Sequence, residues 1–189
     1  TYDNNFIESE WWALKQIYNR GLLYKGFKIV PYCPRCGTPL SSHEEAQGYK
    51  TVKEKSAIAK FPVKGEDKTF FLAWTTTPWT LPSNVALCVN PTETYVKIQV
   101  GEEAYILAQA LAPSGIKEEY TVLETYQGKE LEYREYLPLF DYAHPDKKAC
   151  YVVCDGYVTL TDGTGIVHIA PAFGEDDSRV GRGYDLPFV

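Results

Sequence analysis

The feature that most constrains the fold is a long series of short, strand-like runs separated by turns. The runs are rich in β-branched and aromatic residues, and they cover residues 56–63, 69–75, 85–89, 94–100, 104–108, 120–126, 149–154, 157–160 and 165–169. The polar loop over residues 64–68 indicates a hairpin between the first two runs. This spacing predicts a mixed α/β, β-rich fold, built as a closed or nearly closed β-barrel-like domain with peripheral helices.

Helical patterns lie near both ends of the chain. Residues 6–20 carry apolar side chains on one face, with Asp3 and Asn4 available as caps at the start and Gly21 at the end. A second helix is predicted over residues 175–182, and a short one around residues 109–112. Residues 26–32 predict one more strand, which leads into a cysteine-containing turn.

The sequence predicts that the chain has two parts. Residues 1–50 are expected to form an N-terminal helix and a zinc-ribbon-like junction, and residues 51–189 to form the β-rich domain. With 189 residues and 44% hydrophobic content, the chain is long enough for one well-buried core. It begins at Thr1 and contains no Met, so we expect a piece excised from a longer protein.

A threonine-rich corner follows one of the predicted strands. Thr75, Thr76 and Thr77 come at the end of the run over residues 69–75, and Pro78 and Pro82 prevent that strand from continuing. Threonine hydroxyls donate and accept hydrogen bonds, and β-branching stiffens their χ1 angles. The corner therefore offers hydrogen bonds in fixed directions, although threonines are also ordinary strand residues and the prolines could simply end an edge strand.

A second stretch, over residues 162–177, favours the functional interpretation of the threonine corner over the structural one. It reads Asp-Gly-Thr-Gly-Ile-Val-His-Ile-Ala-Pro-Ala-Phe-Gly-Glu-Asp-Asp. Together with Trp-Thr-Thr-Thr-Pro-Trp-Thr-Leu-Pro-Ser-Asn over residues 74–84, it resembles the editing domain inserted in class I aminoacyl-tRNA synthetases. The residues that follow Trp74 are similar to those of the isoleucyl branch of this family, whereas the leucyl and valyl branches have a Thr-Thr-Arg-Pro core at this position. Residues 5–9 and 31–37 are similar to that branch too, so the resemblance covers essentially the whole chain.

The resemblance implies a proofreading hydrolase. Since a binding pocket rejects a substrate that is one methylene smaller only weakly, a second site is needed to remove valine attached in place of isoleucine. The implied reaction is hydrolysis of the ester that joins valine to the 3′ end of tRNA(Ile), and the resemblance also allows hydrolysis of valyl-adenylate. Because the motifs contain no Ser-His-Asp or Cys-His arrangement, we expect direct attack by water without a covalent intermediate.

The implied site residues come from both motifs. Asp177 is the carboxylate expected to bind the α-ammonium of the substrate, with Asp176 as its weaker neighbour, although acids in a first helical turn are also stabilised by the helix dipole alone. Thr75, Thr76 and Thr77 are expected to bind the ester carbonyl and the terminal ribose. The resemblance makes His168 a pocket wall that excludes isoleucine, and an imidazole could also act as general base. The remaining substrate-binding positions are Trp79, as core or as a stacking surface, and Thr80 and Asn84, which would brace the threonine loop.

Charge and cysteine content limit the partners and cofactors. A formal net charge of −6 argues against a protein that holds nucleic acid by bulk electrostatics, so contact with tRNA should be local. The basic candidates are Lys50, Lys53, Lys55, Lys60, Lys64, Arg179 and Arg182, which could equally form solvated faces. The expected partners are the tRNA(Ile) 3′ end, its valine moiety and the remainder of a synthetase chain. No apolar run is long enough to span a membrane, and a cytoplasmic location is expected.

Cys33 and Cys36 have the spacing of a zinc knuckle and would supply half of a tetrahedral site. No cofactor is expected for editing itself, and zinc is possible in a full-length enzyme, with the other ligands beyond residue 189. His43 could be a third ligand, and Cys150 and Cys154 are better explained as core thiols.

Two alternatives stay open from the sequence. One is an editing domain of another branched-chain synthetase, valyl or leucyl. The other is a non-catalytic zinc-ribbon binding module in which the threonine corner is structural. Only an editing site would order a valyl-adenosine analogue between Thr77 and Asp177.

Overall fold

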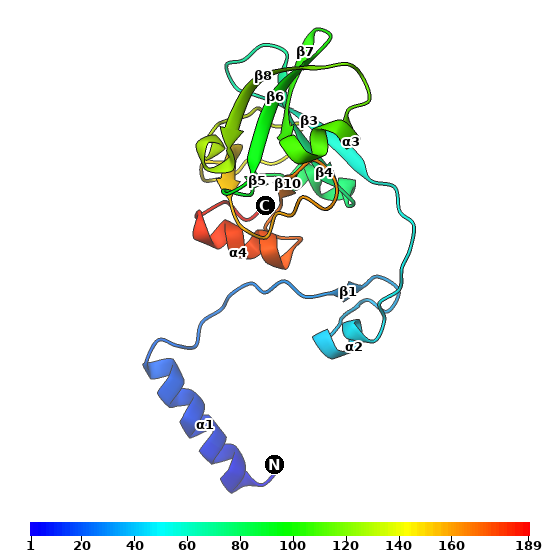
Figure 1. Ribbon diagram of the computed structural model, residues 1–189. Helices are drawn as coiled ribbons and strands as arrows, with labels where there is room; N and C mark the ends of the chain where they lie inside the picture. Colours follow the sequence, from blue (N-terminus) through cyan, green and yellow to red (C-terminus); the bar gives the residue numbers. More distant parts are fainter.

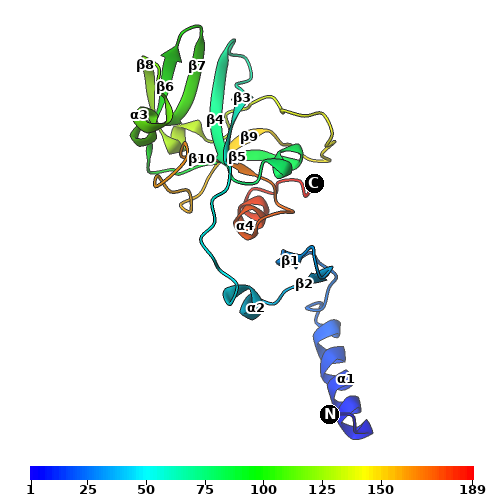
Figure 2. The same cartoon turned by 90° about the vertical axis from the view of Figure 1, so that its right-hand side faces the viewer.

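The computed structural model describes residues 1–189, and its N-terminal segment extends away from the β-rich part (Figures 1 and 2). The segment contains α1 (Asn4–Asn19), the two-residue strands β1 (Tyr32–Cys33) and β2 (Thr38–Pro39), and α2 (Ser42–Ala46). The predicted first helix is confirmed: the Asp3 side chain accepts a hydrogen bond from the Asn5 N–H, and Gly21 follows the helix with a φ of 70°. Neither helix contains a buried residue.

The strand predicted over residues 26–32 is wrong. Only Tyr32 enters a strand, where it pairs with Pro39 across a tight hairpin. Residues 26–31 are irregular because no second strand lies beside them to complete their backbone hydrogen bonds. Apolar residues with strand propensity therefore do not form a strand here.

The remaining strands form one eight-stranded sheet. They are β3 (Ala57–Pro62), β4 (Thr69–Thr75), β5 (Ala86–Val89), β6 (Thr94–Val100), β7 (Glu103–Ala108), β8 (Thr121–Gln127), β9 (Tyr151–Cys154) and β10 (Ile166–Ile169). These agree within a few residues with the runs predicted from the sequence. The order is β8-β6-β7-β4-β10-β5-β9, and β3 pairs with β4 outside that path.

The sheet curls strongly into a half-barrel, but it does not close (Figures 1 and 2). The end strands β8 and β9 do not pair with each other. The predicted β-rich, curled architecture with peripheral helices is therefore confirmed, whereas closure of the barrel is not. The pairing of β4 is divided among three strands. One edge pairs with β3 over its whole length, and the other is divided between β7 at residues 69–71 and β10 at Trp74. The sheet therefore branches at β4.

Short helices complete the fold. They are η1 (Pro78–Ser83), η2 (Gln109–Leu111), α3 (Ala112–Gly115), η3 (Gly128–Leu131) and α4 (Glu175–Gly183). The helices predicted near residues 109–112 and 175–182 are confirmed, whereas η1, η3 and the five-residue α2 were not predicted. No helix of the structure combines the length and the apolar character that crossing a bilayer requires.

The strand predicted over residues 157–160 is also wrong. This segment is a turn whose polar backbone groups are satisfied by side chains. The Tyr157 N–H donates to the Asp155 carboxylate, and the Asn90 side chain donates to the Val158 carbonyl. Side-chain hydrogen bonds of this kind compete with strand pairing.

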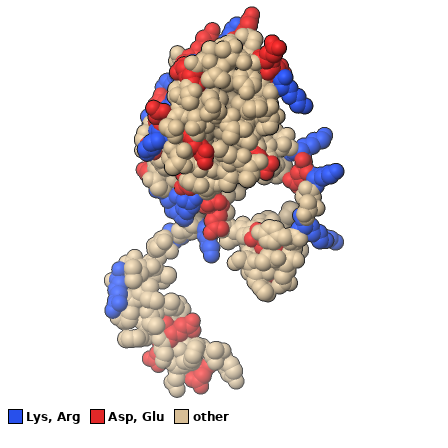
Figure 3. All heavy atoms as spheres, viewed as in Figure 1, with Lys and Arg blue, Asp and Glu red and all other residues tan.

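The core lies inside the curl of the sheet and beneath α4. The largest cluster brings Phe61, Phe71, Leu87 and Ile166 together from four strands, and a second cluster packs Val180 of α4 against the sheet. Cys150 and Cys154 are partly buried against the first cluster, in agreement with the prediction that they are core thiols. Acidic and basic side chains are scattered over the face of the domain seen in Figure 3.

Candidate active site

Strand pairing brings the two sequence motifs together. β10 runs parallel to β4, with Val167 opposite Trp74, so His168 lies beside the end of the strand from which the threonine corner emerges. The chain then turns through Pro171 and Phe173 into α4, whose first turn carries Asp177. Segments that lie about a hundred residues apart in sequence therefore meet at one point.

The meeting point is a cleft with a volume of about 350 Å³. Seven of the predicted site residues line it: Thr75, Thr76, Thr77, Trp79, Thr80, His168 and Asp177. The other lining residues are Trp74, Val167, Phe173 and Gly174. Threonine hydroxyls, one imidazole and one carboxylate thus converge on a single small cavity.

The threonine corner is held by its own hydroxyl groups. The Thr77 N–H donates to Thr75 Oγ1 at 3.0 Å, and the Thr77 and Thr80 hydroxyls lie 3.4 Å apart. The Thr80 hydroxyl also donates to the Thr77 carbonyl at 2.8 Å. Thr76 is exposed at the cleft, and its hydroxyl has no protein partner. The corner is therefore rigid, with one threonine hydroxyl free towards a ligand.

His168 is buried behind this corner, with 5% of its surface exposed. Its Nε2 lies 3.0 Å from Thr80 Oγ1, and its Nδ1 is buried without a hydrogen-bond partner. Burial lowers the pKa of His168 to about 4, because the charged imidazolium loses its hydration. The ring is therefore neutral at neutral pH, where a group with so low a pKa is a weak proton acceptor.

Asp177 lines the same cleft from the first turn of α4. Its carboxylate accepts a hydrogen bond from the Ala170 N–H at 2.9 Å, which ties the start of α4 to the end of β10. Burial raises the pKa of Asp177, and the negative charge of Asp176 adds to this effect, whereas the Ala170 N–H opposes it. A cation bound beside Asp177 would favour the ionised form and offset the cost of its burial.

Two predicted site residues do not line the cleft. The Asn84 side chain accepts a hydrogen bond from the Tyr136 hydroxyl and donates to the Ala86 carbonyl, so it braces the segment that follows η1. Asp176 is exposed and pairs with Arg179, which also forms a bidentate pair with Asp155. Neither side chain faces the cavity that the other seven share.

Sequence reasoning assigned no site role to Trp74, Val167, Phe173 or Gly174, although all four stand within the two motifs. Gly174 precedes α4, and a Cβ atom placed on it would lie 3.1 Å from the Asp177 carboxyl carbon. Glycine at this position therefore leaves room for the Asp177 side chain. Its place in the quoted motif, immediately before three acids, was the available signal.

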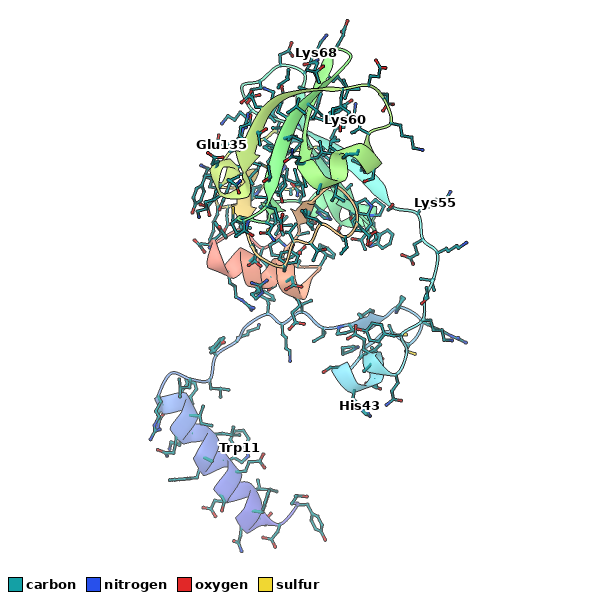
Figure 4. All side chains as sticks on the ribbon, viewed as in Figure 1. Trp11, His43, Lys55, Lys60, Lys68 and Glu135 are labelled. Carbon is teal, nitrogen blue, oxygen red and sulfur yellow. The ribbon has the colours of Figure 1, made fainter.

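The basic candidates differ in their surroundings. Lys60 and Lys64 pair with Glu103 and Glu135 on the domain surface, whereas Lys55 lies on the segment that connects α2 to β3 (Figure 4). Arg179 is engaged by two carboxylates. Three of the basic candidates, Lys60, Lys64 and Arg179, are therefore already paired with carboxylates of the chain.

The cysteine turn has the geometry of a knuckle. The Cys36 N–H donates to Cys33 Sγ at 3.4 Å, and this hydrogen bond is the main reason why the pKa of Cys33 is lowered. No cluster of three or more His, Cys, Asp and Glu side chains suited to a metal forms in the structure. His43 is the second residue of α2 and forms a hydrogen bond with Gln47 (Figure 4). Two thiols from one turn fit half of a tetrahedral zinc site.

Comparison with known proteins gives consistent results. Residues 1–153 match the family model described as tRNA synthetases class I (I, L, M and V). The whole chain is 60% identical to the isoleucine–tRNA ligase of Clostridium acetobutylicum and 50% identical to that of Thermus thermophilus. It spans only 18% of the length of each of these relatives.

Solved structures show the same fold. The P. knowlesi cytosolic leucyl-tRNA synthetase editing domain superposes with a TM-score of 0.54 at 14% identity, over 74% of this chain and 66% of that one. The crystal structure of GlLeuRS-CP1 gives a TM-score of 0.53 at 23% identity, over 60% of this chain and 44% of that one. Taken with the cleft that joins the two motifs, these matches establish that the chain belongs to the class I tRNA synthetases of the isoleucine, leucine, methionine and valine group, with the fold of their editing domain.

Proposed function

We propose that this chain is a proofreading site, which hydrolyses the ester between valine and the 3′ end of tRNA(Ile), with valyl-adenylate as a second candidate substrate. The observation that carries the proposal is the convergence of Thr75, Thr76, Thr77 and Asp177 on one cleft of about 350 Å³. An aminoacyl ester presents an ammonium, a carbonyl and ribose hydroxyls, and the cleft offers a carboxylate and hydroxyl groups to match them.

Each group has a place in the proposed reaction. Asp177 binds the α-ammonium, while the Thr76 hydroxyl and its neighbours donate to the carbonyl oxygen as negative charge develops on it. His168 forms the wall beside the amino-acid side chain. Trp79, which is 71% exposed, and Phe173 provide aromatic surface at the cleft for the terminal adenosine.

Water is the proposed nucleophile. Thr80 Oγ1 and His168 Nε2 have the spacing of a nucleophile and its base, but Thr80 is 6% exposed and its hydrogen is donated to the Thr77 carbonyl. No carboxylate orients the other ring nitrogen of His168. These contacts favour direct attack by a water held in the cleft over a covalent intermediate.

The wider context of the site follows from the family. With a net charge of −6, this chain needs the remainder of a synthetase chain to hold the tRNA body, and only the 3′ end would enter the cleft. The name isoleucine–tRNA ligase carried by the 60%-identical relative favours isoleucyl over valyl or leucyl editing. A cytoplasmic location fits this role.

Zinc belongs to the longer enzyme in this proposal. Cys33 and Cys36 would hold it as thiolates, and the two further ligands would come from segments outside these 189 residues. Bound zinc would stabilise the turn that connects β1 and β2. The hydrolysis proposed for the cleft draws on water and side-chain groups.

The test is a deacylation assay with Val-tRNA(Ile) and Ile-tRNA(Ile). The Asp177→Asn variant should lose about 10- to 150-fold in the rate of valyl ester hydrolysis, because it removes the negative charge that strengthens the hydrogen bond to the substrate ammonium. Asp176→Asn is the matched control, since its carboxylate lies outside the cleft, and it should retain the rate within a few-fold. Full activity of Asp177→Asn would exclude Asp177 from the site, and equal hydrolysis of both esters by the unaltered chain would contradict valine specificity.

A further inference from the structure

Arg179 of α4 forms a contact that the proposed reaction does not use. Its Nη1 donates to Asp155 Oδ2 at 2.7 Å, and its Nη2 donates to Asp155 Oδ1 at 3.0 Å. Nη2 also lies 3.2 Å from the carboxylate of Asp176, which is exposed. Because a planar guanidinium fits a carboxylate through two parallel hydrogen bonds, the pair with Asp155 fixes direction as well as distance.

Asp155 is a rigid anchor for this arginine. It follows β9, and its N–H donates to the Val89 carbonyl at 3.0 Å. Its Oδ1 also accepts a hydrogen bond from the Tyr157 N–H at 3.0 Å, and the guanidinium lies 5.8 Å from the centre of the Tyr157 ring. Since the backbone and the carboxylate of Asp155 are both held, its contact with Arg179 ties α4 to the sheet.

The first turn of α4, which carries Asp177, has few polar attachments. Its N-cap residue is Gly174, which makes no side-chain cap hydrogen bond. The Asp177 carboxylate is held by one hydrogen bond, from the Ala170 N–H at 2.9 Å. Val180 packs against the core from the same helix, but an apolar contact has no preferred direction. The orientation of α4 about its axis therefore depends on the directional pair with Asp155.

We propose that Arg179 is a positioning residue, which clamps α4 to Asp155 and so fixes the place of the Asp177 carboxylate at the cleft. Residues two apart in an α-helix point in different directions, so Arg179 can hold the flank of α4 while Asp177 lines the cleft. A rotation of α4 would carry this carboxylate away from the Ala170 N–H and from a bound ammonium. The effect on hydrolysis rests on the proposed function, whereas the effect on the place of Asp177 does not.

The first test is hydrogen exchange of the Ala170 amide, measured by NMR in the 189-residue chain, because this N–H is bonded to Asp177. The reference is the Val85 amide, which donates to the carbonyl of Ile169, one residue before Ala170. In Arg179→Gln the Ala170 amide should exchange about 2- to 5-fold faster relative to Val85, the range expected for loss of a partly exposed ion pair. Global destabilisation would accelerate both amides alike.

Asp155→Asn tests the other partner of the pair. Asparagine keeps the shape of aspartate and can still accept a hydrogen bond from the Tyr157 N–H, so the turn should persist. This variant should show the same selective rise, and the double variant with Arg179→Gln should show no more than either alone. A mere effect of charge on exchange would act in opposite directions in the two single variants, because one removes a positive charge and the other a negative charge.

Arg182→Gln is the matched control. Arg182 is an exposed arginine in the last turn of the same helix, and it forms no ion pair in the structure. Its removal should leave the ratio of the Ala170 and Val85 exchange rates unchanged. An unchanged ratio in folded Arg179→Gln or Asp155→Asn would overturn the proposal, and so would an equal change in Arg182→Gln. Failure of both test variants to fold would make the pair a purely structural contact and would overturn the proposal as well.

The second test compares two esters of tRNA(Ile), one with valine and one with isovalerate, which is valine without its α-amino group. Since Arg179 acts through the carboxylate that binds the ammonium, Arg179→Gln should raise KM for the valyl ester by about 2- to 5-fold, with kcat nearly unchanged, and should not affect the isovaleryl ester. Equal effects on the two esters, or a loss confined to kcat, would overturn the link to substrate binding. If the unaltered chain hydrolysed neither ester, the proposed function would fail, and the exchange ratio would still decide whether Arg179 positions Asp177.

Discussion

Burial of the His168 imidazole couples the stability of the fold to pH. Its pKa is lowered to about 4 by burial, against an ordinary value near 6.5 in the unfolded chain. Between these values the unfolded state binds more protons than the folded state, so the free energy of unfolding rises with pH across this window. The contribution is fully present above about pH 6.5 and is lost as the pH falls towards 4.

We therefore expect the unaltered chain to lose about 3 kcal/mol more than His168→Gln between pH 7 and pH 4. Urea unfolding at several pH values measures the difference. Asp177 acts in the opposite direction, because its pKa is raised and its contribution falls as pH rises, but it is present in both proteins. Parallel stability curves for the two proteins would show that His168 is not held neutral by burial.

Single residues were predictable where a motif names them. The threonine corner, His168 and Asp177 all line the cleft. They could be predicted because they belong to two motifs whose amino-acid sequences resemble those of a known family. The partners of Asn84 and His168 were not predictable. Tyr136 reaches Asn84 from a segment 52 residues away, and the unpartnered Nδ1 depends on how β10 packs behind η1.

At the scale of elements, the site depends on the turn that leads into β10. Gly165 has a φ of 72°, and a Cβ atom placed on it would lie 2.4 Å from the Ala108 Cβ atom. The Gly165 carbonyl accepts a hydrogen bond from the buried Tyr95 hydroxyl, and the Ala108 N–H donates to the neighbouring Thr164 carbonyl. β7 and β10 therefore approach too closely at this turn for any side chain.

Gly165→Ala should lower the free energy of unfolding by about 2–5 kcal/mol, from left-handed backbone strain together with overpacking. The matched control is Gly156→Ala, since Gly156 has open space around it and no positive φ. Chemical denaturation of the two variants provides the comparison. Equal stability would mean that the approach of β7 to β10 relaxes at no cost.

Strand propensity predicted these elements well where a neighbour completes them. Residues 69–75 and 94–100 became β4 and β6 with the predicted bounds. Residues 26–32 have a similar composition but no neighbouring strand, and at residues 157–160 side chains satisfy the backbone. Closure of the barrel could not be predicted for a related reason, because whether the end strands β8 and β9 pair depends on the whole sheet and not on the composition of any single segment.

At the scale of the whole molecule, the N-terminal segment and the β-rich part are connected by few contacts. The Phe27 ring stacks on Phe188 with centroids 5.1 Å apart, and this contact joins the segment to the C-terminal end. α1 presents an apolar face to solvent, where Trp11 is 68% exposed (Figure 4). The core clusters contain no residue before Ala59. The cooperative fold should therefore reside in the residues that follow the segment.

A chain of residues 51–189 should fold alone and keep the thermal midpoint of the full chain within about 5 °C. The expected loss is that of one aromatic pair, about 0.5–1.5 kcal/mol, which shifts the midpoint of a domain of this size by a few degrees. Circular dichroism of the β-sheet signal measures it. Phe27→Ala in the full chain isolates the stacking contribution and should reproduce whatever shift the truncation causes. The shorter chain should also aggregate less, because it lacks the apolar face of α1.

If residues 51–189 failed to fold while Phe27→Ala remained stable, the N-terminal segment would be part of the folding unit and the domain boundary at residue 50 would be wrong.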